Sequence, residues 1–457
     1  MKLKTRIASI LAIIMLLVFG ATACDRGGPN YEIGDDGEII ITKPVVLRFA
    51  APDGSFKEEI DQFAAGFKKL YPQVTIKYEP ISGDWTSKLL TQISGGNAPD
   101  LFWAEEIYSY ASRGALENLN PYFEKLGEDR EDYFQGMFLN GTYKDGLYML
   151  PREYNKVVTY YNKAIFDKAF GNLPLEQLPY KDHAREVNGK YYPANGWTWD
   201  EFVATAQALA IPTANGQGYL QRGADISFHW PSSGPILFDS LGGTIRKVDG
   251  DGKEYIDFNN ENNKKILQNI VNLTNSGAFV NPALNDVGTM LEGNIGMIFN
   301  SRPATMEMEN KFGSEWDVVT FPIIPGKPQI GSGSSGYAVY SKSKNKELAV
   351  RLLFYMTSQE GQELFMKTGN CVPVKQSLIE SETWRENPRS DINHDAFVWK
   401  DEYDVPAYNL NFDSLVAKNK FAAAWGEVST ALFNGDMSLA EAMAYGQEQL
   451  DNIFVNN

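Results

Sequence analysis

The sequence predicts an α/β fold, because short apolar strands alternate with amphipathic helices. Residues 45–50 (VVLRFA) and 74–78 (VTIKY) have the pattern of buried strands. Between them, residues 57–70 place Ile60, Phe63 and Phe67 on one face at helical spacing. A helix over 85–93 and a strand over 99–104 continue the alternation. This order is typical of largely parallel sheets flanked by helices.

Length and composition restrict the class of protein. The 457 residues carry a formal net charge of −16, which argues against nucleic acid or an anionic membrane surface as the partner. Two cysteines are too few for a disulfide scaffold. Three histidines and no cysteine pair leave almost nothing from which to build a zinc site. We therefore expect neither a cofactor nor a metal.

The N-terminus has the pattern of an export signal. Lys2, Lys4 and Arg6 precede an apolar stretch over 7–19 that is too short to span a bilayer. The segment GATA at 20–23 supplies small residues directly before Cys24, which resembles a bacterial lipobox with a lipidated cysteine. The lipobox usually has Leu where this chain has Ala21, and ATA at 21–23 also fits ordinary cleavage. Free secretion therefore stays open beside lipid anchoring.

The segment after Cys24 is predicted to be a tether. Residues 24–44 are rich in Gly, Asp and Glu and poor in apolar side chains, which suits a flexible connection between a membrane and a folded body. No later stretch is continuous and apolar enough to cross a membrane. We expect the body to lie on the extracytoplasmic face of the cell membrane.

The second half of the chain contains further recognisable elements. Thr198 with Glu201, and Ser438 with Glu441, have the spacing of helix capping boxes. DGDG at 249–252 lacks the later ligands of a calcium loop, so a hairpin turn is predicted there. Strands are predicted over 295–299, 317–321 and 337–340, and a helix over 346–356.

The order of several short motifs resembles the family 1 extracellular solute-binding proteins, the group of maltodextrin- and multiple-sugar-binding receptors. The resemblance covers nearly all of the chain after Cys24. The motifs that carry it are FKKLYP at 67–72, SGGNAPD at 94–100, GLYMLP at 146–151, YYNK at 160–163, WTW at 197–199, MLEGNIGM at 290–297 and SKSKNK at 341–346.

The resemblance implies a type II periplasmic-binding-protein-like fold with two α/β lobes and a ligand cleft between them. Crossings between the lobes are then expected near 151–155, 331–335 and Val374. The first lobe would hold residues 45–154 and 333–374, and the second 155–332 and 375–457. Residues 1–23 would be the signal peptide and 24–44 the tether.

The resemblance also implies a function. A receptor of this family captures an oligosaccharide and delivers it to the permease of an ABC transporter by hinge closure. We expect such a receptor to be no enzyme and to act as a monomer. Its partners would be the sugar, the permease subunits and, through Cys24, the membrane. Arginines near the cleft hint at an acidic sugar, although Arg also binds neutral sugars.

Candidate ligand-binding residues lie where strands end or where the chain crosses between lobes. Aromatic faces and planar polar groups at such places suit a sugar. The candidates are Asp53, Ser55, Trp103, Glu105, Arg152, Tyr154, Asn155, Trp230, Arg302, Ser334 and Ser335. Asp53 can alternatively cap the next helix, Arg152 can pair with a carboxylate of the other lobe, and Trp230 can belong to the core.

Other classes of function fit less well. A glycoside hydrolase would need paired carboxylates, and the sequence contains no recognisable signature of that kind. A receptor for a peptide, a polyamine or a metal ion is the nearer rival. Polyamine binding needs several acids in the cleft, and Glu105 and Asp225 alone would not supply them.

Overall fold

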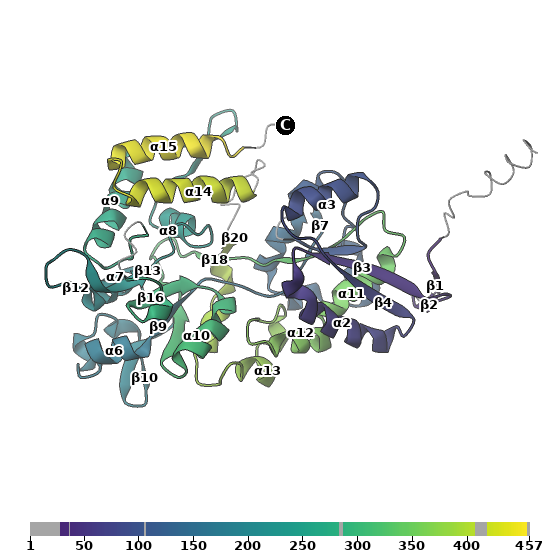
Figure 1. Ribbon diagram of the computed structural model, residues 1–457, viewed down its shortest axis with the longest axis horizontal. Helices are drawn as coiled ribbons and strands as arrows, with labels where there is room; N and C mark the ends of the chain where they lie inside the picture. The colour runs from purple at the N-terminus through teal and green to yellow at the C-terminus, as the bar shows by residue number, and fades with distance from the viewer. Residues whose placement is uncertain (1–27, 36, 105–106, 283–286, 407–417, 455–457) are drawn as a thin grey trace, which may run out of the picture.

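The computed structural model describes residues 28–35, 37–104, 107–282, 287–406 and 418–454. These residues form two lobes arranged side by side along the long axis of the molecule (Figure 1). Each lobe is built on a five-stranded sheet. The predicted two-lobed α/β fold is therefore confirmed.

The first lobe has the strand order β4–β3–β5–β19–β8. Its strands are β3 (Val45–Ala51), β4 (Val74–Pro80), β5 (Leu101–Ala104), β8 (Leu150–Pro151) and β19 (Gly336–Val339). Its helices are α2 (Lys57–Leu70), α3 (Trp85–Ser94), α4 (Tyr108–Ala111), α5 (Asn120–Leu126), α11 (Lys346–Thr357) and α12 (Gln359–Met366). Helix α2 has the predicted bounds, because Ile60, Phe63 and Phe67 are all buried on one face.

The second lobe has the strand order β12–β13–β16–β9–β17. Its strands are β9 (Val158–Asn162), β12 (Ile211–Pro212), β13 (Tyr219–Asp225), β16 (Ile295–Asn300) and β17 (Trp316–Thr320). Its helices are α6 (Lys163–Phe170), α7 (Trp199–Leu209), α8 (Gly234–Ser240), α9 (Glu261–Asn275), α10 (Thr305–Phe312), α14 (Lys418–Phe433) and α15 (Leu439–Asp451). Both predicted capping boxes form, at the starts of α7 and α15.

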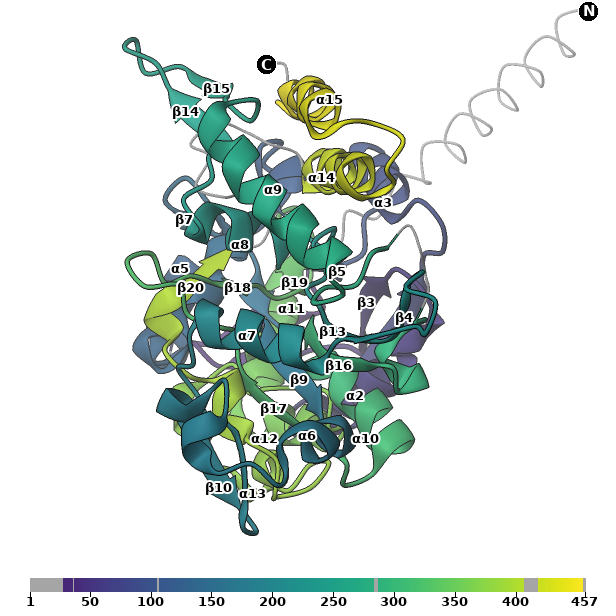
Figure 2. The same ribbon diagram turned by 90° about the vertical axis from the view of Figure 1, so that its left-hand side faces the viewer.

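Two hairpins project from the second lobe. The DGDG segment connects β14 (Arg246–Val248) to the antiparallel β15 (Glu254–Ile256), as the hairpin interpretation requires. Figure 2 shows this hairpin extending beyond α9, with α14 and α15 beside it. The segment around 179–192 forms the hairpin of β10 (Ala184–Val187) and β11 (Lys190–Pro193). Arg185 of this hairpin pairs with Asp317 on β17 and donates to the Tyr161 hydroxyl on β9.

The sheets are less parallel than the sequence predicted. In the first lobe β19 runs antiparallel to both of its neighbours, and in the second lobe β9 does the same. Each of these strands is the first that the chain forms after crossing from the other lobe. It therefore enters the sheet from the hinge end, opposite to the strands that follow a local helix.

The tether prediction was wrong for its second half. Strands β1 (Tyr31–Ile33) and β2 (Ile39–Ile41) form an antiparallel hairpin on the first lobe. Tyr31 and Ile39 are buried in the core of that lobe. The Tyr31 hydroxyl donates to the Lys344 carbonyl, and Arg351 donates to the Gly37 carbonyl. The local composition did not indicate this hairpin, because its few apolar residues pack against residues that are far away in the sequence.

Two crossing segments pair with each other between the lobes. The chain leaves the first sheet after β8 and returns through β18 (Ile330–Ser332). The Val157 amide donates to the Gly331 carbonyl (2.8 Å), the Gly333 amide to the Asn155 carbonyl (3.0 Å), and the Arg152 amide to the Ser335 carbonyl (2.9 Å). Strand β18 also pairs in parallel with β20 (Asp404–Pro406). The hinge is thus a small sheet rather than two loose connections.

The third crossing lies later than Val374. Ser377 still donates to Asp132 of the first lobe through its amide (2.8 Å) and its hydroxyl (2.7 Å). The connecting stretch also contacts the second lobe, because its Gly369 and Asn387 carbonyls accept from Arg302, and Arg389 further along donates to the Trp316 carbonyl (2.7 Å). Helix α13 (Glu382–Arg385) lies on the connecting stretch.

A buried ion pair fastens the hinge. Lys156 Nζ lies 2.8 Å from Asp404 Oδ1, and both side chains are almost fully buried (0% and 1% exposed). Lys156 also donates to the Trp399 carbonyl (2.6 Å), and the Tyr154 hydroxyl donates to Asp404 Oδ2 (2.6 Å). Burial raises the pKa of Asp404 to about 6, an effect that Lys156 opposes.

We predict that Asp404→Asn lowers the free energy of unfolding by about 3–5 kcal/mol, because it leaves the Lys156 ammonium buried without a counter-charge. The double variant Lys156→Met/Asp404→Asn should regain most of that loss, and urea unfolding near neutral pH measures both. Asp61→Asn, which removes the exposed pair of Lys57 and Asp61, is the control and should change stability by less than about 1 kcal/mol. An equally small effect of Asp404→Asn would contradict the prediction.

Candidate functional site

A cavity of about 190 Å³ lies against the two paired crossing segments. Its wall is made of backbone and side chains from both segments, the turn after β13, the end of β16 and the short helix η3 (Gln135–Gly141). The lining residues are Asn140, Glu153, Asn155, Lys156, Val157, Trp230, Ser232, Ser301, Gly331, Ser332, Gly333, Ser334 and Ser335. Residues of both lobes and of the hinge therefore meet at one place.

Close backbone packing shapes one side of this cavity. A Cβ atom on Gly331 would lie 1.7 Å from the Ser232 carbonyl oxygen, so only glycine allows β18 to approach the turn that carries Trp230. Ser227, two residues after β13, has a positive φ of 44°. Its hydroxyl donates to the Phe299 carbonyl of β16 (3.2 Å). These contacts fix the turn from which the partly exposed Trp230 side chain reaches the cavity.

Four of the residues predicted from the sequence line the cavity: Asn155, Trp230, Ser334 and Ser335. Each comes from a crossing segment or from the turn after β13, where the sequence placed it. Trp230 is only partly buried. The structure therefore brings together an aromatic face, an amide and two hydroxyls, and their contact with a ligand stays a prediction.

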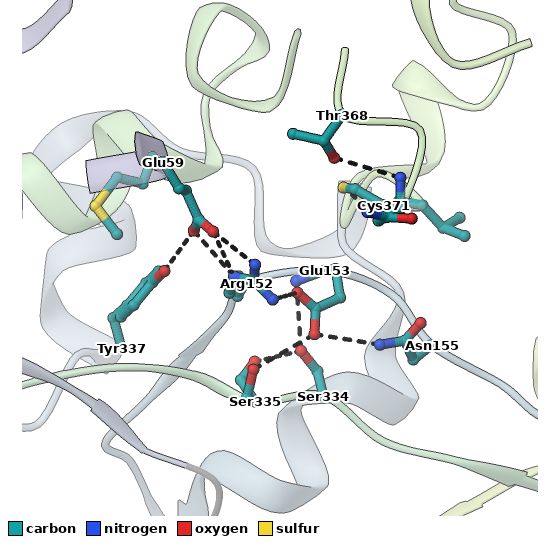
Figure 3. A network of polar contacts seen from close by, with 12 residues as sticks. Glu59, Arg152, Glu153, Asn155, Ser334, Ser335, Tyr337, Thr368 and Cys371 are labelled. Atoms are coloured by element: carbon teal, nitrogen blue, oxygen red, sulfur yellow. Dashed lines mark hydrogen bonds and ion pairs between the residues drawn. The ribbon is translucent and has the colours of Figure 1, made fainter. Parts of the chain in front are cut away.

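Arg152 is occupied by two carboxylates (Figure 3). Its guanidinium donates to Glu59 of α2 (2.9 Å and 2.6 Å) and to Glu153 (2.6 Å). The Tyr337 hydroxyl donates to the same Glu59 carboxylate (2.5 Å). Burial by itself would lower the pKa of Arg152, but the negative groups around it raise the pKa well above its usual value. Arg152 thus pairs with Glu59 of its own lobe and with the adjacent Glu153, whereas the sequence interpretation had placed its carboxylate partner in the other lobe.

Glu153 is the carboxylate that reaches the cavity. It accepts hydrogen bonds from Arg152, from Asn155 Nδ2 (3.2 Å) and from the Ser335 hydroxyl (3.4 Å). Burial raises the pKa of Glu153, Arg152 opposes that rise, and the nearby Glu59 adds to it. The Glu153 carboxylate therefore lies beside a second carboxylate, Glu59, and the two share the positive charge of Arg152.

Two predicted ligand residues are engaged elsewhere. Tyr154 is fully buried, its ring stacks on Phe134 with centroids 4.1 Å apart, and its hydroxyl is bound to Asp404. Arg302 is also fully buried, and it donates to the Gly369 carbonyl (2.9 Å) and to the Asn387 carbonyl. Neither lines the cavity. The adjacent Ser301 does line the cavity. The sequence therefore located the end of this strand correctly, but the Arg302 side chain does not point into the cavity.

Arg302 belongs to a buried cluster with His394. Its guanidinium donates to His394 Nδ1 (3.3 Å) and packs over Phe397 and Trp384. His394 Nε2 donates to the Arg389 carbonyl (2.9 Å). Burial lowers the pKa of His394 to about 4, and the neighbouring Arg302 adds to this effect. The arrangement therefore holds a neutral imidazole with its proton on Nε2.

The remaining candidates lie near the start of the first lobe. Asp53 accepts a hydrogen bond from the Ser55 amide (2.7 Å) and so caps the short helix η1 (Gly54–Phe56), and both residues are exposed. Trp103 is partly buried between Phe56 and Trp85. None of these three lines the cavity. Glu105 lies outside the described residues, as does Cys24.

The sequence did not indicate Glu153, Lys156 or Glu59 as part of this region. Glu153 and Lys156 are sequence neighbours of predicted residues. Because they lie on the predicted crossing segment, the whole segment could have been named as a candidate. Glu59 carried no signal, since it lies on the polar side of α2. Its partner Arg152 is far away in the sequence, and only the tertiary fold joins them.

The described part of the chain contains neither a metal-binding cluster nor a bilayer-spanning helix. No group of three or more His, Cys, Asp or Glu there could hold a metal ion. No described helix has the length and apolar character needed to span a bilayer. Cys371 is fully buried, and burial raises the pKa of its thiol well above the usual value. Trp425 is in the core, as predicted, and donates to the Phe228 carbonyl (2.6 Å).

We predict that His394 makes the protein less stable in acid. The unfolded chain takes up a proton below about pH 6.5 and the folded chain only below about 4, so stability is lost as the pH falls through this window, by about 3 kcal/mol at most. His394→Gln should reduce the difference in unfolding free energy between about pH 7 and about pH 4.5 by about 2–3 kcal/mol in chemical denaturation. The exposed His229→Gln is the matched control. An unchanged difference for His394→Gln would refute the assignment.

Known proteins resemble this chain in sequence and in fold. Residues 62–390 match the family of bacterial extracellular solute-binding proteins. A search of curated proteins finds no matching sequence. An ABC substrate-binding protein of Listeria monocytogenes, solved with cycloalternan, is 21% identical with a TM-score of 0.67, and the match covers 89% of this chain and 98% of that one.

Two further structures give the same picture. The sugar-binding protein MalE of Xanthomonas citri has a TM-score of 0.70 at 17% identity, covering 89% of this chain and 97% of that one. A sugar transporter protein of Rhizobium etli in an open conformation has a TM-score of 0.68 at 20% identity, covering 89% and 99%. At this level of identity the likeness establishes the two-lobed fold. Because the family match extends over most of the chain, the protein belongs to the bacterial extracellular solute-binding proteins.

Proposed function

We propose that the protein is the substrate-binding component of an ABC transporter and captures an oligosaccharide in the cavity at the hinge. The observation that carries this proposal is that both crossing segments and residues of both lobes line one cavity. An aromatic face with hydroxyls and amides beside it suits the alternating C–H and O–H surfaces of a sugar. The similar proteins of Listeria and Xanthomonas, solved with cycloalternan or named as sugar-binding, support the same class of ligand.

Ligand binding would act directly on the hinge. A sugar that contacts Trp230 from the second lobe and Asn140 from the first gains both contacts only in the closed arrangement. The closed state is thereby stabilised by differential affinity, and the permease would recognise that state. As the family resemblance implies, we propose that the receptor acts as a monomer.

An enzymatic role has less support. A retaining glycosidase needs two carboxylates about 5 Å apart at the scissile bond, whereas the described lining contains one carboxylate, Glu153. Two carboxylates do stand close to the cavity, but Arg152 lies between them and pairs with both. The pairing of Arg152 with both carboxylates also disfavours a polyamine as the ligand. A polyamine carries at least two positive charges, and the cavity would offer a single uncompensated negative charge.

We also propose that the chain is anchored to the outer face of the cell membrane through a lipid on Cys24. The β1–β2 hairpin is fixed to the first lobe, and its hydrogen bonds begin at Asn30. The stretch from Cys24 to Asn30 can span roughly 20 Å when fully extended. The first lobe would therefore stay near the membrane while the second moves about the hinge.

The Cys24→Ala variant tests the anchor. In a bacterial host that processes lipoproteins, the natural chain should fractionate with the membranes and the variant should be found in the soluble extracytoplasmic fraction. Fractionation followed by immunoblotting, with mass spectrometry of the N-terminus, measures both. A natural chain released without lipid would show instead that cleavage follows the ATA sequence at 21–23.

The Trp230→Ala variant tests the sugar site. A thermal-shift screen of α- and β-linked glucose oligosaccharides, amino acids and polyamines should first identify a sugar that raises the melting temperature. For that sugar, calorimetry should show roughly 30-fold weaker binding by Trp230→Ala, the loss expected when a buried aromatic anchor is truncated. The control is Tyr255→Ala on the β15 hairpin, an exposed aromatic away from the cavity. Unchanged binding by Trp230→Ala would place the sugar elsewhere.

A further inference from the structure

Several hydrogen-bond donors in the cavity wall formed by the crossing segments are already engaged by partners within the protein. Lys156 is directed to Asp404 and to the Trp399 carbonyl. The Ser335 hydroxyl donates to Glu153, and the Ser334 hydroxyl donates to the Ser335 carbonyl. Because a hydroxyl has a single proton to donate, neither serine can give a second hydrogen bond to a ligand without breaking the first.

One hydrogen-bond acceptor on the same wall, in the Asn155 side chain, has no partner among the described residues. Asn155 donates through Nδ2 to Glu153, which fixes the orientation of its amide group. Its Oδ1 atom is buried and accepts no hydrogen bond from the described residues. A buried acceptor without a partner is unfavourable, so a ligand that donates to Asn155 Oδ1 gains more there than one that accepts.

The charges of this wall do not cancel. Glu59 and Glu153 share the one guanidinium of Arg152 (Figure 3). Lys156 cannot supply the missing positive charge, because Asp404 already neutralises it. The described groups around the cavity therefore carry one surplus negative charge, and Glu153 is the carboxylate of that set which lines the cavity. Partial exclusion of water strengthens its field on a bound group.

The sequence analysis suggested that two arginines, Arg152 and Arg302, lie near the cleft, and either could have supplied a positive charge to the ligand. Arg152 is paired with two carboxylates, and the fully buried Arg302 donates to backbone carbonyls and to His394. Both are unavailable to a carboxylate on a ligand. The expectation of an acidic sugar depended on free arginines near the cleft, and these two arginines are not free.

We propose that the sugar bound in this cavity carries a protonated amino group that faces Glu153 and Asn155, so that the receptor prefers amino sugars to neutral sugars and rejects uronates. This inference rests on the proposed sugar-binding function. An ammonium group donates to both acceptors and supplies the missing positive charge. Trp230 on the same cavity offers an aromatic face, which attracts a cation as well as the apolar side of a sugar ring.

The test compares sugars of the same ring size that differ in one substituent. The probes are glucose, glucosamine, 6-amino-6-deoxyglucose, N-acetylglucosamine and glucuronate, with binding measured by calorimetry near neutral pH. We expect at least one of the two free amines to bind about tenfold or more tightly than glucose, since charge-assisted hydrogen bonds are roughly twice as strong as neutral ones. N-acetylglucosamine should lose this advantage, and glucuronate should bind more weakly than glucose.

The Glu153→Gln variant assigns the preference to one group. It keeps the size of the side chain and removes its charge, so the ratio of amine affinity to glucose affinity should fall to about one, whatever the change in glucose affinity itself. The control is Glu402→Gln, which removes an equal charge from an exposed side chain near β20 and should leave the ratio unchanged. The ranking by the natural protein needs no variant, so the test stands even if Glu153→Gln fails to fold.

The outcomes separate this inference from the proposed function. If neutral sugars bind but neither free amine binds more tightly than glucose, the amino-sugar inference is wrong and the sugar-binding function stands. A preference that survives in folded Glu153→Gln would also overturn the inference, because the charge would then come from another group. If no probe and no oligosaccharide of the thermal-shift screen binds, the sugar-binding function itself fails.

Discussion

The pairing of the two crossing segments is the constraint on which the rest of the structure depends. Three backbone hydrogen bonds join residues 152–157 to residues 331–335, and β20 extends this small sheet from a third direction. Strands β9 and β19 enter their sheets directly after these segments, which is why each runs against its neighbours. The same pairing brings Glu153, Asn155 and Ser335 together, so the geometry of the hinge also determines the wall of the cavity.

Charged groups at such a place must be compensated inside the protein. Removing a buried partner is costly because the remaining ion has lost its water, and each ionised group at the hinge has at least one close partner. Lys156 and Asp404 form a closed pair, whereas Arg152 serves two carboxylates at once. Arg302 has carbonyls and an imidazole in place of a carboxylate. The balance of charge differs among these three clusters of described residues, and of the three the Arg152 cluster is the one that combines a surplus negative charge with an opening to the cavity.

Local patterns predicted the elements well and their long-range partners poorly. The bounds of α2, both capping boxes and the DGDG hairpin follow from interactions within a few residues, and all were confirmed. The ion pair of Lys156 with Asp404 joins residues far apart in the sequence, and no periodicity indicates it. For the same reason the β1–β2 hairpin was taken for a tether. At the cavity, strand ends were located correctly, but whether a side chain such as Arg302 turns inward was decided by partners that the sequence does not reveal.

The residues that connect the lobes are also residues that line the cavity, and this overlap has a thermodynamic consequence. If the lobes close about this hinge, as proposed, a ligand that contacts Asn155 and Ser335 would act on the segments whose backbone changes during closure. Coupling between binding and closure is reciprocal, so a change that favours the binding-competent hinge geometry must raise the affinity in proportion to the population of that geometry. Affinity in such a protein therefore measures the hinge as well as the ligand contacts. A polar cluster on the hinge can in this way select a ligand and set the closure equilibrium together.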